Sequence, residues 1–190
     1  MRLPVSKLVV PSCLKGQENG KLDASLLKPC GVSSFKMVEP AARAMRALVA
    51  AAEQRGIQVR ATSTYRTYAQ QVALFRSRYQ LEPLPGCPKK IWNGRVWYQK
   101  PQTAVAAVPG TSNHGLGLAI DFAEERDGRP PVESVSDRFI RWLCRNADKY
   151  GYSAELQSEP WHWRYVAGDK IPQAVIDFEL QQDNPPIAKP

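Results

Sequence analysis

The stretch at residues 116–123, LGLAIDFA, constrains the fold most, because it is apolar apart from one acid, Asp121. A short apolar run of this kind, interrupted only by glycine and one acid, predicts a buried strand. His114, one of two histidines in the chain, lies just before it. Gly115 and Gly117 indicate close backbone packing beside His114, where a bulky side chain would not fit. The sequence thus combines a buried strand with a histidine and an acid that packing alone does not require.

Periodic segments around this strand predict an α+β fold. Apolar residues at helical spacing define four helices, at residues 39–56, 67–79, 136–150 and 171–180. Alternation and turn signals define further strands, at residues 57–62, 91–98 and 161–166. Strand–helix–strand units do not repeat regularly in this order. The order of the predicted elements therefore favours a small antiparallel central sheet flanked by helices over a doubly wound sheet.

Three local signals set boundaries within this pattern. Thr67 with Gln70 matches a helix capping box, and Asn93-Gly94 is typical of a tight hairpin. The charged, glycine- and proline-containing residues 124–131 are expected to form a turn.

The 190-residue chain fits one domain, or one domain with an appended arm. Weak periodicity makes residues 1–38 an irregular lead-in, residues 39–180 the domain, and residues 181–190 a linker-like tail. A stretch as long and aperiodic as residues 81–111 is typical of a functional lid or rim. Cys13 and Cys30 could form a disulfide, and the sequence leaves this pairing open.

Charge and hydropathy exclude several classes of protein. The net charge is +8, but the basic residues are scattered rather than gathered in a stripe, which argues against a nucleic-acid partner. No apolar run approaches the roughly 20 residues that a membrane span needs. The N-terminus lacks an apolar stretch long enough for a secretory signal. A basic protein of this kind would be drawn to an anionic surface such as a bacterial wall.

The two histidines point to a metal site. His114, Asp121 and His162 supply two imidazoles and one carboxylate, a ligand set that suits a catalytic zinc with one open position. Glu159 lies three residues before His162 and could accept a proton from a metal-activated water. The alternative is that each histidine is a surface residue or a hydrogen-bonded core residue, which is the commoner case for a lone histidine.

Three motifs in this region resemble a known family. SNHGLGLAID, at residues 112–121, fits S-x-H-x-x-G-x-A-x-D, and EPWH, at residues 159–162, fits E-x-W-H. The upstream STYRTYAQQVALF is similar to the family's YRS…Q…LF segment, with Thr67 in place of serine. Between residues 40 and 170 the chain therefore resembles the D-alanyl-D-alanine carboxypeptidases of the VanY type. This family belongs to a wider group of zinc peptidases that includes VanX-like dipeptidases, phage endolysins and Hedgehog-type domains.

The resemblance implies a Hedgehog/VanX-like fold and one zinc ion per chain, bound by His114, Asp121 and His162. It implies that Glu159 is the general base and then the acid, and that Arg66 holds the substrate or the developing oxyanion. The remaining candidates for substrate binding are Gln71, Ser112 and Trp161.

The function expected from the resemblance is zinc-dependent hydrolysis of D-amino-acid-containing bonds in peptidoglycan stem peptides by a monomer. Carboxypeptidase and endopeptidase action stay open. The alternative is a non-catalytic, zinc-stabilised wall-binding module, which the retention of Glu159 disfavours. Without a secretory signal, the chain is expected to be released by a phage, as an endolysin is, or to have been trimmed. Zinc affinity is expected to fall below about pH 6, where free imidazole takes up a proton.

Overall fold

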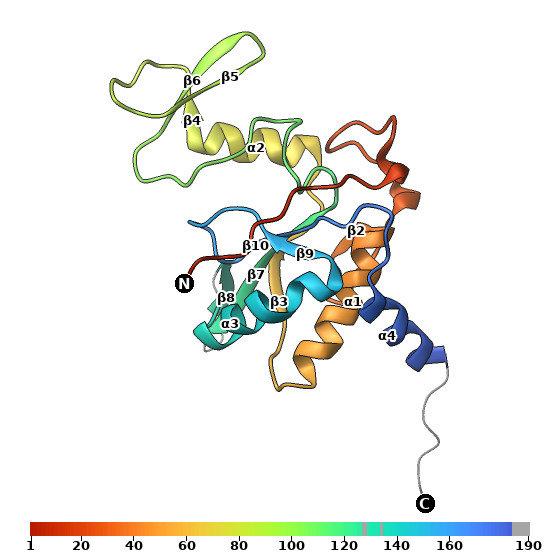
Figure 1. The fold of residues 1–190 in the computed structure, drawn as a ribbon. Helices are drawn as coiled ribbons and strands as arrows, with labels where there is room; N and C mark the ends of the chain where they lie inside the picture. The colour runs from red at the N-terminus through yellow and green to blue at the C-terminus, as the bar shows by residue number, and fades with distance from the viewer. Residues whose placement is uncertain (127–128, 134, 184–190) are drawn as a thin grey trace, which may run out of the picture.

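An antiparallel sheet of five strands organises the computed structural model, which describes residues 1–126, 129–133 and 135–183 (Figure 1). The strand order is β3 (Arg60–Ser63), β7 (Ala119–Arg126), β10 (His162–Tyr165) and β9 (Tyr152–Ala154), and β8 (Arg129–Glu133) pairs with β7. The predicted α+β class with a small antiparallel sheet is confirmed. Ile120 and Phe122 of β7 are fully buried, as the apolar run predicted.

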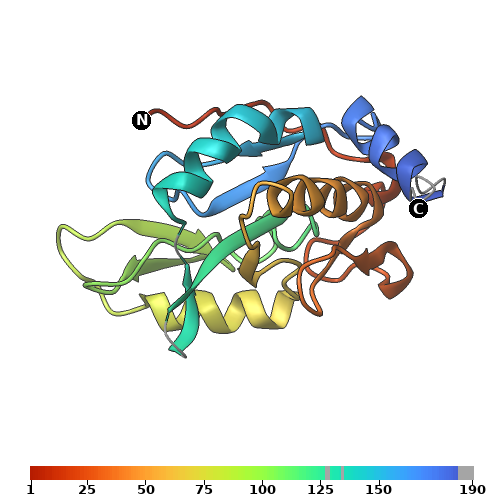
Figure 2. The ribbon, with the colours of Figure 1, turned by 90° about the horizontal axis from the view of Figure 1, so that it is seen from below.

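Helices cover this sheet unequally. Figure 2 shows α1 (Glu39–Glu53), α3 (Asp137–Asn146) and α4 (Gln173–Asp183) on one side of the strands, and α2 (Tyr68–Arg78) on the other. Arg43 on α1 forms a bidentate ion pair with Glu179 on α4, with nitrogen–oxygen distances of 2.8 and 2.6 Å. Within the described residues, no helix is long and apolar enough to cross a membrane.

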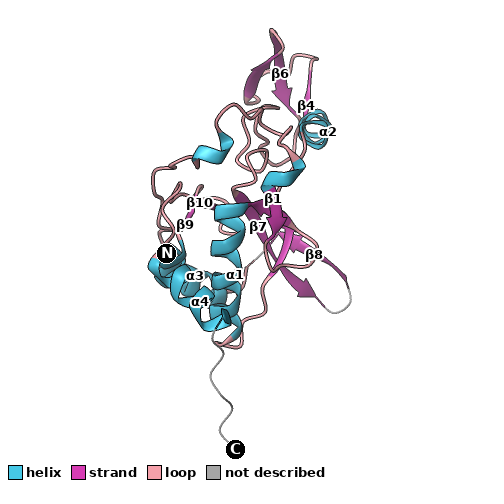
Figure 3. Cartoon of the chain, turned by 90° about the vertical axis from the view of Figure 1, so that its right-hand side faces the viewer, coloured by secondary structure: helices cyan, strands magenta, loops and turns pink. Residues whose placement is uncertain are grey.

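A second, smaller sheet lies at the α2 end of the molecule, away from α1, α3 and α4 (Figure 3). It consists of β4 (Tyr79–Gln80), β6 (Arg95–Gln99) and β5 (Lys89–Trp92) in that order. Asn93 and Gly94 join β5 to β6 with φ angles of 50° and 68°, so the predicted hairpin is confirmed. Phe75 of α2 packs into this unit. The predicted capping box of α2 is also present.

Residues 1–38 pack into the same core as the rest of the chain. They form two short 3₁₀ turns, Ser12–Leu14 and Ala24–Leu26, and two strands, β1 (Leu27–Pro29) and β2 (Lys36–Val38). Apolar side chains from this segment join the main core cluster: Leu3, Leu14, Leu22, Cys30, Val32 and Met37. Cys13 and Cys30, whose pairing the sequence left open, are both free thiols in this structure.

The turn predicted at residues 124–131 is too long, because residues 124–126 and 129–131 belong to strands, and residues 127–128 lie outside the described part. β7 continues to Arg126, β8 occupies Arg129–Glu133, and the two strands pair with each other. Antiparallel backbone pairing extends both strands here, and hydrophobic periodicity does not register such pairing. Downstream, a 3₁₀ turn at Ala147–Tyr150 completes the predicted third helix and ends at Gly151, whose φ is 73°. Of the predicted tail, residues 184–190 lie outside the described part.

Candidate metal centre

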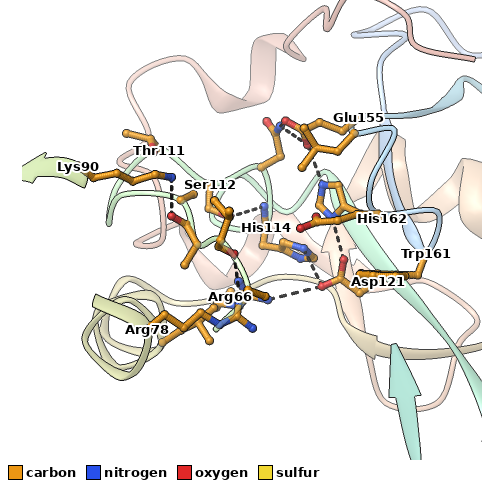
Figure 4. A pocket seen from close by; sticks show the side chains of 18 residues that line it. Arg66, Arg78, Lys90, Thr111, Ser112, His114, Asp121, Glu155, Trp161 and His162 are labelled. Atoms are coloured by element: carbon orange, nitrogen blue, oxygen red, sulfur yellow. Dashed lines mark hydrogen bonds and ion pairs between the residues drawn. The ribbon is translucent and has the colours of Figure 1, made fainter. Parts of the chain in front are cut away.

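Two neighbouring strands place an acid and a histidine side by side. In the antiparallel register of β7 and β10, Asp121 lies directly opposite His162. His114 reaches the same point from the turn before β7. The three residues are buried, and each offers a ligand atom within 4.8 Å of the others. Figure 4 shows the side chains converging. Among the described residues, these three form the group that could hold a metal ion.

The distances in this group are those of a tight cluster. Asp121 Oδ1 lies 2.7 Å from His162 Nδ1, and Asp121 Oδ2 lies 3.0 Å from His114 Nε2. One carboxylate thus bridges two imidazoles, through different ring nitrogens. Burial raises the pKa of Asp121, but hydrogen bonds and charge from both histidines lower it further, to well below its usual range.

The other nitrogen of each ring is held from outside the cluster. His114 Nδ1 lies 2.6 Å from the backbone carbonyl of Thr64, and because a carbonyl only accepts, Nδ1 is the donor. This leaves the lone pair of His114 Nε2 facing Asp121. His162 Nε2 lies 2.7 Å from Glu155 Oε2. When the ring is neutral and Nε2 carries the proton, the lone pair of His162 Nδ1 also faces Asp121. Outer hydrogen bonds of this kind fix tautomer and orientation in metal-binding histidines.

Glu155 is the site residue that sequence analysis missed. Its carboxylate accepts from Asn113 Nδ2 at 2.7 and 2.8 Å and from Arg164 Nη1 at 3.1 Å, in addition to its contact with His162. Burial raises its pKa, but these hydrogen bonds and charges lower it to about 2. Its only signal in the sequence is an acid seven residues before a histidine, which matches no motif.

The same contacts act on His162 in the opposite direction. Burial lowers the pKa of His162, but hydrogen bonds and charge from Asp121 and Glu155 raise it to about 9 in the protein without metal. A ring lying between two carboxylates is therefore protonated at neutral pH until a cation replaces the proton.

The close packing predicted beside His114 is confirmed. A Cβ added to Gly115 would lie 2.0 Å from Asn19 Oδ1, and Gly117 has a φ of +64°. Asn19 also donates to the carbonyl of Ser112 at 2.8 Å, so the lead-in segment supports the turn that carries His114.

Arg66 extends from the end of β3 toward the cluster. Its Nη2 lies 3.6 Å from Asp121 Oδ2 and donates to Ser63 Oγ at 2.9 Å. Its Nη1 donates to Gln71 Oε1 at 3.0 Å, and Gln71 Nε2 donates to the carbonyl of Ala107 at 2.8 Å. Gln71 is 2% exposed, so it lies behind Arg66 and positions it.

A cavity of about 300 Å³ opens over the three clustered residues. Its walls include four predicted site residues: Arg66, Ser112, Glu159 and Trp161. The backbone N–H of His162 donates to the carbonyl of Glu159 at 2.9 Å, a tight turn that keeps Glu159 beside the cluster. Ser112 Oγ accepts from the backbone N–H of His114 at 3.2 Å. Trp163, by contrast, is fully buried in the core.

Comparison with known proteins finds a family and a shared fold. The model of the family described as "VanY: D-alanyl-D-alanine carboxypeptidase" matches residues 34–168. A putative carboxypeptidase, YodJ of Bacillus subtilis (strain 168), is 30% identical over 151 residues, which cover 74% of this chain and 50% of YodJ. The chain thus spans about half the length of that relative.

Two solved structures share the fold. The LD-carboxypeptidase LdcB, whose structure concerns peptidoglycan recognition, has a TM-score of 0.55 and 26% identity, covering 87% of this chain and 76% of LdcB. The vancomycin-resistance D,D-pentapeptidase VanY of a VanB-type cassette, solved with Zn(II), has a TM-score of 0.50 and 21% identity. That match covers 87% of this chain and 86% of the other.

Proposed function

Because this chain belongs to the VanY family of D-alanyl-D-alanine carboxypeptidases, we propose that it is a zinc-dependent D,D- or L,D-carboxypeptidase of peptidoglycan stem peptides. One observation carries the proposal: His114, Asp121 and His162 converge at the floor of a cavity that Glu159 and Arg66 also line. The D,D-pentapeptidase with Zn(II) and the LD-carboxypeptidase LdcB support both the metal and the substrate class.

The donor set fits zinc. Two imidazole nitrogens and one carboxylate are the ligands of a catalytic zinc that keeps a position open, whereas structural zinc sites have four protein ligands. The hydrogen bonds at His114 Nδ1 and His162 Nε2 leave the ligand atoms pointing inward. The alternative of a non-catalytic wall-binding module is disfavoured for two reasons. The metal-binding group among the described residues has three members rather than four, and Glu159 lines the same cavity.

In the proposed mechanism, this chain's residues orient the peptide and move one proton. Zinc, when bound, supplies Lewis acidity that activates water and polarises a carbonyl. Glu159 accepts the proton of the attacking water and delivers it to the leaving amine. Arg66, beside Asp121, stabilises negative charge that develops on the scissile carbonyl oxygen.

The other predicted site residues take supporting roles in this proposal. Ser112 and Trp161 line the cavity and contact the peptide, while Gln71 holds Arg66 in place. The protein works as a monomer on the bacterial wall. Release by a phage stays a prediction from the sequence.

Purified stem peptides test the function directly. We expect the zinc-loaded protein to remove one C-terminal D-amino acid, read as the mass loss of a single residue, and a chelator to abolish this activity. Fragments cut inside the stem would instead show an endopeptidase. Binding to walls without any cleavage would contradict the proposal in favour of the binding module.

Zinc uptake should depend on pH up to about pH 9. Since the pKa of His162 is raised to about 9 without metal, zinc must displace its proton at neutral pH. Apparent affinity should therefore rise about tenfold per pH unit between pH 7 and 9, because one proton is released. The dependence on pH would thus begin well above the pH 6 expected from a free imidazole. Calorimetry in buffers of different ionisation enthalpy counts the proton, and zinc binding without proton release at pH 7.5 would contradict the prediction.

A further inference from the structure

Charge is distributed unevenly around the cavity. Glu155 and Glu159 lie among the residues that line it, and so do three cations, Arg66, Arg78 and Lys90. In Figure 4, Arg78 and Lys90 lie on the side of His114 opposite Glu155 and Trp161. We call Arg78 and Lys90 the basic end of the cavity. The proposed mechanism gives these two residues no role.

The basic end is assembled from separate parts of the chain. Arg78 is the last residue of α2 and Lys90 lies in β5, and both are half-buried. Arg78 Nη1 donates to the carbonyl of Val105 at 2.8 Å, and Lys90 Nζ donates to that of Ala106 at 2.7 Å. These carbonyls are consecutive, so both cations hold the same stretch of the cavity wall, residues 105 and 106.

Neither cation of the basic end has an acidic partner among the described residues. Arg66 differs, because it faces Asp121 at 3.6 Å. Burial lowers the pKa of Lys90, and no carboxylate offsets this. Each head group uses one of its several N–H donors on a carbonyl, so others are left for a ligand. Half-buried cationic groups with spare donors form strong hydrogen bonds to an anion such as a carboxylate.

A purely structural role does not require the charges. The basic end anchors the wall at residues 104–107, and Lys90 also lies 5.8 Å from the centre of the Tyr79 ring. However, Gln71 anchors the next carbonyl, that of Ala107, at 2.8 Å with a neutral amide. Anchoring alone therefore leaves the positive charge at positions 78 and 90 unexplained.

We propose that Arg78 and Lys90 form a subsite for a carboxylate of the peptide that enters the cavity. This inference rests on the proposed function. A stem peptide offers two sources of this group: the C-terminal α-carboxylate, and the side-chain carboxylate of a dicarboxylic residue. Either would lie at the basic end while the scissile bond lies over His114 and Asp121.

Paired peptides test the subsite and separate the two sources. One pair differs in a free or amidated C-terminus, and the other in diaminopimelate or lysine at the third position. For the wild type, we expect loss of the bound carboxylate to lower kcat/KM and binding affinity by about 10- to 100-fold, as for a charged hydrogen bond. The wild type should discriminate within the pair that differs in the bound carboxylate. The double variant Arg78→Gln, Lys90→Gln should show equal kcat/KM and equal affinity for both members of that pair, with zinc content unchanged.

Two variants control for the structural role. Lys90→Arg keeps the charge and should keep the discrimination. Lys100→Gln removes a lysine that donates to the carbonyls of Arg76 and Ser77 outside the cavity, and should behave as wild type. The inference is overturned if the double variant weakens charged and neutral peptides by the same factor, or if the wild type distinguishes neither pair. If no peptide is cleaved, the proposed function fails, and calorimetric binding of the same pairs still decides on the subsite.

Discussion

Glu159→Ala is expected to lower turnover at least 100-fold while zinc content and the unfolding temperature stay close to wild type. Glu159 lines the cavity and is not a member of the group that could hold the metal. Its removal would therefore take away the proposed proton acceptor and leave the proposed ligands in place, and loss of general acid–base catalysis typically costs about 10²–10⁴-fold in rate. Elemental analysis, thermal unfolding and single-turnover kinetics on stem peptides measure these three quantities.

Glu155→Gln is the matched control, because it neutralises the other acid of the same cavity wall. Glu155 contacts Nε2 of His162, the ring nitrogen that faces away from Asp121, so it is not placed to accept a proton from the attacking water. We expect its change to weaken zinc affinity by about 10- to 100-fold and to leave turnover nearly intact once the site is saturated. If instead Glu155→Gln loses turnover and Glu159→Ala does not, the assignment of the base is wrong.

His162→Ala is expected to abolish turnover together with zinc binding. The substitution removes one of three proposed ligand atoms and leaves Asp121 and Glu155 facing each other without the ring that separates them. Two like charges at a buried site repel, so the unfolding temperature should fall as well. The fall should be smaller at low pH, where a carboxyl takes up a proton. Zinc titration and thermal unfolding at pH 5 and 8 measure these effects. Full zinc occupancy in His162→Ala would contradict the ligand assignment.

The sequence by itself determined the parts of the molecule that depend on local spacing. The capping box at Thr67 and the Asn93-Gly94 hairpin form where predicted, because each depends only on residues a few positions apart in the sequence. The convergence of His114, Asp121 and His162 was also predictable. Two of them lie seven residues apart around one buried strand, and the third lies in a motif whose order and spacing resemble a known family.

Only the tertiary structure decided what surrounds these residues. The partner of His114 Nδ1 is a backbone carbonyl 50 residues away, and a carbonyl has no signature in the sequence. Glu155 reaches His162 because β9 and β10 are antiparallel neighbours joined by a short loop. Arg78 and Lys90 line the same cavity because the 81–111 stretch folds back along α2, bringing the carbonyls of residues 105 and 106 to them. Each depends on contacts between segments distant along the chain. Motif spacing therefore predicted the three clustered residues, whereas packing determined the hydrogen bonds and charges around them.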